Sequence, residues 1–152
     1  MNHEEFTKAI HKQQMFINKL FIDRHNISKA IEKITKEYYS DIIGKFFYIS
    51  SDDRGKFRGL GEGYYFIYGV GVTGNYVSDD RVDIYLLVRK YGITTHGMDK
   101  VIAIDIIDDR LYHSLEEDTK AKIEKCLVSE EEAVNSLRNY CDILIGNFTK
   151  MD

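Results

Sequence analysis

The sequence predicts a single α+β domain, and two patterns carry this prediction. Apolar residues recur every three, four or seven positions in the N-terminal third, which is the spacing of a helix that is buried along one face. Runs of β-branched and aromatic residues then fill the middle of the chain, and helical patterns return after residue 114. We therefore expect an N-terminal helix or helix pair, a four- to five-stranded and mostly antiparallel sheet, and two C-terminal helices within residues 1–152.

The composition is that of a globular protein. Hydrophobic residues make up 43% of the 152 residues and charged residues 30%, which is enough apolar material for a core without disulfides or metals. The net charge of −4 and the lack of a basic cluster argue against nucleic acid as the partner. The acidic, polar start and the short apolar runs predict a cytoplasmic protein that does not enter a membrane. Cys126 and Cys141 lack metal-ligand spacing and are expected to be reduced thiols.

The N-terminal helical pattern begins with a capping box formed by Asn2 and Glu5. Its apolar stripe then continues through Phe6, Ile10, Ile17, Leu20, Ile27, Ile31, Ile34, Tyr38 and Ile42. Two interpretations fit: one helix over about residues 3–43, or two helices that meet near Asn26. The unbroken phase slightly favours one helix. A helix of that length would extend about 60 Å and would require a partner chain to cover it.

Four stretches predict strands: Lys45–Ser50, Tyr64–Thr73, Arg81–Tyr91 and Lys100–Ile107. The short connections between them predict antiparallel pairing. Strict alternation along the second stretch would place Val70 and Val72 on the same face as Tyr64. Glycines interrupt its other face and suggest strong twist, a bulge or a helix packed close to the backbone. Both faces of the sheet are apolar, so we expect helices or a second subunit to cover them.

The C-terminal third predicts two helices, each with a capping box at its start. Ser114 with Glu117 predicts a helix over about 115–127, and Ser129 with Glu132 predicts one over 130–148.

Acidic residues on two of the strands suggest one catalytic alternative. Asp83 and Asp105 lie on antiparallel strands that follow the helical segment carrying Glu37. This arrangement resembles the core of restriction-type nucleases, in which carboxylates bind Mg²⁺ and a lysine activates water. The resemblance implies a metal-dependent nuclease or phosphoesterase, although Ile107 stands where that family has its lysine. The alternative interpretation is structural, with Asp105 paired to Arg89 or to a helix end.

A second alternative is a ligand-binding module. Arg58, Tyr64, Tyr65 and His96 surround the glycine-rich strand in the predicted layout, and together they would suit a small anionic or nucleotide-like molecule. The match to G-x-G-x-x-G at residues 69–74 is followed by loop-forming residues instead of a helix, so a dinucleotide fold is not indicated.

The leading hypothesis is a non-enzymatic interaction protein. The chain lacks a convincing catalytic set, its histidines have no metal-ligand spacing, and its apolar sheet and N-terminal stripe require a partner surface. We therefore expect an inhibitor, an immunity-type protein or an accessory factor that binds another protein and forms a homo-oligomer. No cofactor and no metal are predicted.

Overall fold

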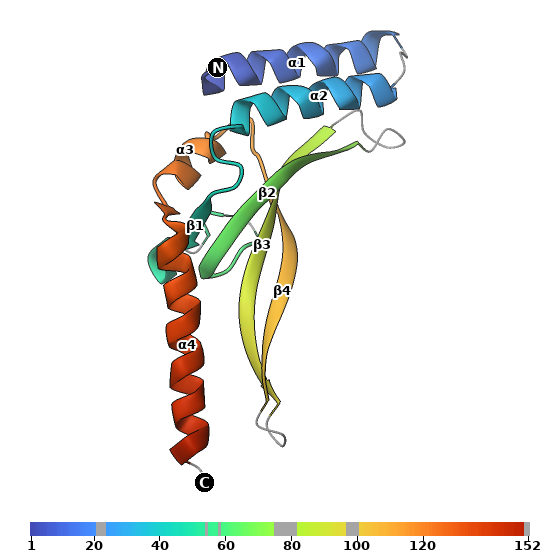
Figure 1. Ribbon diagram of the computed structural model, residues 1–152. Helices are drawn as coiled ribbons and strands as arrows, with labels where there is room; N and C mark the ends of the chain where they lie inside the picture. The colour runs from blue at the N-terminus through green and yellow to red at the C-terminus, as the bar shows by residue number, and fades with distance from the viewer. Residues whose placement is uncertain (21–23, 54, 58, 75–81, 97–100, 151–152) are drawn as a thin grey trace.

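The computed structural model confirms the α+β class (Figure 1). It describes residues 1–20, 24–53, 55–57, 59–74, 82–96 and 101–150. Its elements are α1 (His3–Leu20), α2 (Arg24–Tyr39), β1 (Phe46–Ile49), the 3-10 turn η1 (Ser51–Asp53), β2 (Gly63–Gly74), β3 (Val82–His96), β4 (Val101–Tyr112), α3 (Thr119–Glu124), β5 (Leu127–Val128) and α4 (Glu130–Lys150).

The sheet has five strands in the order β4-β3-β2-β1-β5, and every pairing is antiparallel. The pairing of β3 with β2 reaches Lys90, which lies opposite Tyr65, whereas its pairing with β4 continues to His96 opposite Val101. The end of β3 and the start of β4 therefore form a two-stranded ribbon that projects from the sheet alongside α4 (Figure 1). The third strand was predicted to end at Tyr91, with a connection from Gly92 to the next strand; this was wrong, because β3 continues through that glycine to His96.

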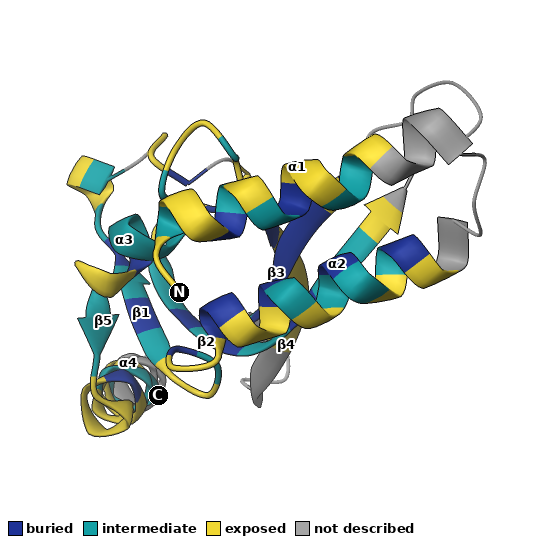
Figure 2. Ribbon diagram, turned by 90° about the horizontal axis from the view of Figure 1, so that it is seen from above, coloured by how far each residue is buried: buried dark blue, intermediate teal, exposed yellow. Residues whose placement is uncertain are grey.

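The N-terminal stripe forms two helices, so the single-helix interpretation was wrong. Helices α1 and α2 pack side by side across one end of the sheet (Figures 1 and 2). Phe6 and Ile10 of α1 and Ile27 and Ile31 of α2 are buried between the helices and the sheet. Each helix thus buries part of the stripe within the chain, and no second subunit is needed to cover it. The predicted cap is present, since the Glu5 amide donates to Asn2 Oδ1 at 2.8 Å.

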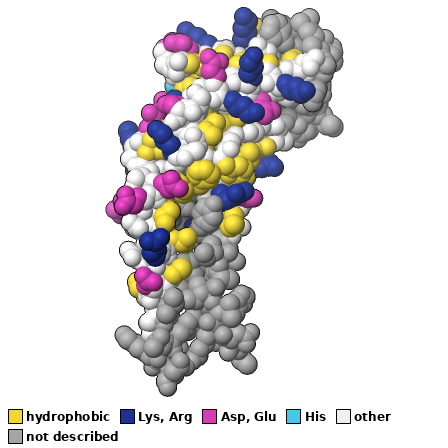
Figure 3. All heavy atoms as spheres, in the orientation of Figure 1, with side chains coloured by type: hydrophobic (Ala, Val, Ile, Leu, Met, Phe, Trp, Pro, Cys, Tyr) yellow, Lys and Arg dark blue, Asp and Glu magenta, His cyan; other side chains and the backbone are white. Residues whose placement is uncertain are grey.

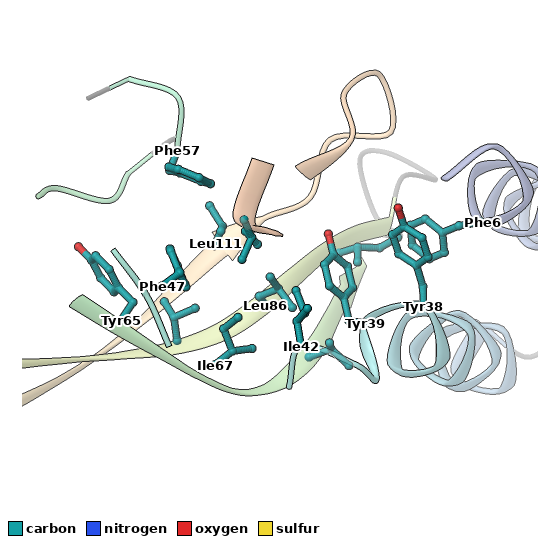
Figure 4. Packing of buried hydrophobic residues seen from close by; sticks show 14 of the residues in the cluster. Phe6, Tyr38, Tyr39, Ile42, Phe47, Phe57, Tyr65, Ile67, Leu86 and Leu111 are labelled. Carbon is teal, nitrogen blue, oxygen red and sulfur yellow. The ribbon is translucent and has the colours of Figure 1, made fainter. Parts of the chain in front are cut away.

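One face of the sheet forms the hydrophobic core (Figure 4). Phe47, Ile67 and Leu86 of three neighbouring strands are fully buried on this face. Phe57 from the turn after η1 and Ile123 of α3 close the core from the side opposite the sheet. Burial of each such side chain stabilises the fold by about 1.5–3 kcal/mol relative to its exposure, so this face is the principal source of stability.

A β-bulge in β2 changes which residues face the core. The register of β2 against β3 shifts between Ile67 and Gly69, so Tyr68 is the extra residue. The prediction that Val70 shares a face with Tyr64 was therefore wrong: Val70 is buried on the core face beyond the bulge. Tyr64 and Phe66, which precede the bulge, lie on the opposite face of the sheet, whereas Tyr65 between them faces the core.

The C-terminal helices differ in how well their capping boxes predicted them. Ser129 caps α4 as expected, because its Oγ accepts from the Glu132 amide at 3.1 Å. Ser114 does not cap α3, and the expected helix over 115–127 was wrong in its start and its length. Its hydroxyl accepts from the nearby Glu116 amide instead, and Asp118 caps the short α3 by accepting from the Ala121 amide at 3.1 Å.

Candidate functional site

The face of the sheet opposite the core, called here the outer face, is rich in aromatic residues. The Phe46 and Phe66 rings lie 4.9 Å apart across β1 and β2, and the Tyr48 and Tyr64 rings lie 4.5 Å apart on the same pair of strands. Figure 3 shows hydrophobic side chains gathered over β2 and extending toward α4 on this side of the molecule. The outer face is therefore an amphipathic surface that α4 covers only along one border.

Two arginines are stacked on tyrosines of the outer face. The Arg89 guanidinium lies 4.7 Å from the centre of the Tyr68 ring, and its Nε donates to Asp108 Oδ1 at 2.8 Å. The Arg110 guanidinium lies 4.5 Å from the centre of the Tyr85 ring. Stacking positions both guanidinium groups, and the ion pair with Asp108 also positions that of Arg89, so two cations border the aromatic surface.

A cavity of about 430 Å³ lies between the first three turns of α4 and the outer face. Val134, Leu137 and Tyr140 line it from the helix, and Phe46 and Tyr64 line it from the sheet. A second hollow shares Tyr64 and Tyr140 with the first and continues along α4 to Ile143, which is 60% exposed. The two hollows together form a groove along one side of the helix, called here the α4 groove.

Strand β4 exposes apolar side chains along the edge of the sheet. Ile106, Ile107 and Tyr112 are 58%, 52% and 48% exposed, which is high for large hydrophobic residues. In the sheet that the structure describes, β4 is an edge strand with β3 as its neighbour on one side alone. Edge strands present unpaired backbone groups to which another strand can add. This edge is the second candidate surface.

The four predicted ligand residues do not form one site. Tyr64 lines the α4 groove, but Tyr65 points into the core on the opposite face and its hydroxyl donates to the Gly61 carbonyl at 2.9 Å. His96 lies six residues beyond Lys90 on β3, about 20 Å from the level of Tyr65 at 3.3 Å per residue. Arg58 lies outside the residues that the structure describes.

The carboxylates of the nuclease alternative are not brought together by the sheet. Asp83 lies opposite Thr73 near the start of β3, whereas Asp105 lies opposite Gly92, nine residues further along β3. The two backbone positions are about 30 Å apart along the ribbon. Glu37 is exposed on α2. Among the described residues, no three His, Cys, Asp or Glu side chains are grouped so that they could hold a metal ion. Arg89 pairs with Asp108, the residue opposite it on β4.

A buried polar contact joins α2 to the segment that follows β4. Tyr39 Oη lies 2.6 Å from His113 Nδ1, and both side chains are buried. Burial raises the pKa of Tyr39, so the phenol stays protonated and donates a hydrogen bond to the imidazole. Burial, reinforced by His3, lowers the pKa of His113 to about 4, so this imidazole is neutral at pH 7. The contact is structural and lies apart from the two candidate surfaces.

Sequence reasoning did not identify Lys90, Glu130 or the exposed edge of β4 as parts of a site. The high apolar content of residues 100–107 was a usable signal for that edge, but it does not show which strand lies outermost.

The helices that the structure describes include none that is long and apolar enough to cross a membrane. No family model matches the sequence, and comparisons with curated proteins and with solved structures find no match either. The function of this chain must therefore be argued from its own geometry.

Proposed function

We propose that this protein is a non-enzymatic interaction protein of the cytoplasm, an inhibitor or accessory factor, and that it forms a homodimer through the edge of β4. The exposed apolar residues of that edge carry the proposal, since monomeric proteins seldom leave a row of large hydrophobic side chains on a free strand. A second copy is the partner that the sequence of this edge fits best.

The backbone pattern limits how two β4 strands can pair. The His113 amide donates to the Ile84 carbonyl of β3, so odd-numbered residues of β4 direct their backbone groups toward β3. Even-numbered residues therefore direct theirs outward. In a symmetric antiparallel pair, outward-directed residues must oppose one another, so the twofold axis has to pass through a residue and not between two residues.

A twofold axis at Asp109 gives the most complementary pairing. Asp108 then lies opposite Arg110 of the second copy, and the exposed Ile107 and Ile106 lie opposite Leu111 and Tyr112 of the second copy. Cross-strand pairs of these kinds each contribute about 0.2–1 kcal/mol. An axis at Asp108 would instead place Ile107 opposite Asp109 and Ile106 opposite Arg110. The apolar and charged residues of β4 are therefore arranged in a self-complementary order around residue 109.

One unfavourable contact limits the strength of the dimer. In this pairing Asp109 lies opposite Asp109 of the second copy, and like charges directly opposite each other destabilise a strand pair. In the single chain its carboxylate accepts from the Arg110 amide at 2.8 Å, one of the outward-directed groups. Asp109→Asn removes the repulsion and is expected to tighten the dimer.

Light scattering coupled to size-exclusion chromatography tests the proposal over a range of concentrations. The wild-type chain should approach twice the mass of 17.7 kDa, whereas Ile107→Asp should stay a monomer. Met15→Asp is the matched control, because Met15 is 52% exposed on α1, far along the chain from β4. A wild-type monomer at every concentration, or equal behaviour of the two Asp variants, would contradict the proposal.

A further inference from the structure

The cavity under α4 combines a largely apolar wall with few charged groups. Phe46, Tyr64, Val134, Leu137 and Tyr140 supply the apolar surface, and Lys90 and Glu130 supply the charges. Its volume of about 430 Å³ lies within the range of roughly 300–1,000 Å³ that is common for small-molecule sites. Both its size and its lining therefore suit a small organic molecule with an apolar body.

Lys90 lies opposite Tyr65, so its side chain leaves β3 on the core side of the sheet and joins the lining of this cavity at Gly63, where the backbone of the turn before β2 holds it. Its Nζ donates to the Glu62 carbonyl at 2.7 Å, and it lies 5.6 Å from the centre of the Tyr65 ring. The lysine stem crosses Gly63 so closely that a Cβ on this glycine would lie 2.7 Å from Lys90 Cε. Gly63 also has a φ of +144°, which favours glycine. The glycine thus makes the room in which the lysine lies.

The ammonium group retains capacity to bind an anion. A lysine ammonium has three N–H donors, and the Glu62 carbonyl occupies one of them. Among the residues that the structure describes, no carboxylate lies within ion-pair distance of Lys90. A cation that borders an apolar cavity without a paired carboxylate attracts a negatively charged group of a ligand.

We infer that this cavity binds a small molecule with an apolar or aromatic body and a single negative charge, which lies against the Lys90 ammonium. The charge is single because Glu130 lines the same cavity and repels a second one. The inference concerns a different surface from the β4 edge and does not rest on the proposed dimer.

Two fluorescent probes of similar shape separate the role of the charge from that of the apolar wall. Anilinonaphthalene sulfonate carries one negative charge on an aromatic body, and phenylnaphthylamine has the same body without the charge. The wild-type protein should bind both with a saturable rise in fluorescence. Lys90→Met should weaken the sulfonate about tenfold or more, because it removes a hydrogen bond to a charged group, and should leave the neutral probe unchanged.

Further variants test the geometry and exclude loss of folding as the cause. Gly63→Ala should weaken the sulfonate because it displaces Lys90, and Glu130→Gln should strengthen it because it removes a repulsive charge. Tyr140→Ala should weaken both probes. Melting curves by circular dichroism identify any variant that is unfolded. If Lys90→Met is unfolded, Lys90→Gln replaces it. Equal sulfonate affinity in the wild type and the folded Lys90 variant, or no saturable binding of either probe, would overturn the inference.

Discussion

The buried His113 makes the stability of this protein depend on pH. The pKa of the imidazole is about 4 in the folded chain, because burial disfavours the imidazolium and His3 lies beside it, whereas its ordinary value is 6.5. Asp118 acts in the opposite direction, and the neighbouring Tyr38 and Tyr39 contribute uncharged phenols that keep their protons. The unfolded chain therefore binds more protons than the folded chain between these two pH values.

The sign and size of the effect follow from this difference. A lowered folded-state pKa gives stability that is complete above pH 6.5 and is lost as the pH falls toward 4. The full contribution is about 3 kcal/mol at 1.36 kcal/mol per pKa unit, and about 2 kcal/mol of it is lost between pH 7 and pH 5. This is a large share of the stability of an ordinary domain, which is about 5–15 kcal/mol.

Urea unfolding at a series of pH values measures this loss. The wild type should lose about 2 kcal/mol more of its free energy of unfolding between pH 7 and pH 5 than His113→Gln, which cannot titrate at this position. His11→Gln removes an exposed histidine of α1 and should behave like the wild type. If the wild type and His113→Gln depend on pH equally, the assignment of the buried neutral imidazole is incorrect.

Three further changes probe the sheet and α4 by the free energy of unfolding in urea. Phe47→Ala removes a fully buried ring and should cost about 3–5 kcal/mol, and a loss below about 1 kcal/mol would mean that the core is packed differently. Gly71→Ala should cost about 1–3 kcal/mol, because its Cβ would lie 2.3 Å from the Tyr85 ring, while Gly61→Ala, with nothing within 4 Å, serves as its control. Ser129→Ala removes the cap of α4 and should cost about 1 kcal/mol; no change would show that the cap is not formed in solution.

Much of the fold could be predicted because local patterns determine it. The capping boxes at Asn2 and Ser129 lie where α1 and α4 begin. These caps could be predicted because the accepting oxygen and the donating amide are only three residues apart in the sequence. Runs of β-branched and aromatic residues located β1, β2, β3 and β4. Where prediction failed, a competing local or tertiary contact decided the outcome. Asp118 replaced Ser114 as the cap of α3, and its Oδ1 also accepts from the Tyr38 hydroxyl of α2 at 2.9 Å.

The candidate sites were harder to predict because they depend on register and strand order. A bulge of one residue at Tyr68 moves Val70 from the outer face to the core; the glycines of this strand indicated a bulge but not the residue at which it occurs. Asp83 and Asp105 lie on neighbouring antiparallel strands as predicted, but the register places Asp105 opposite Gly92, nine residues along β3 from Asp83. Lys90 and Glu130 line the same cavity because α4 packs beside the start of β2, and that is a tertiary contact between segments distant in the sequence.

Cysteine cross-linking at residue 109 tests the central claim most directly, because it reports both association and register. The variant combines Asp109→Cys with serine at Cys126 and Cys141. In the proposed dimer the two copies of residue 109 form a non-hydrogen-bonded pair with Cα atoms about 4.5 Å apart, which is within the range that a disulfide can bridge. Mild oxidation should therefore give a covalent dimer, and Asp108→Cys in the same background should give far less of it. Failure of the residue 109 variant to cross-link, or equal yields from both positions, would contradict the account.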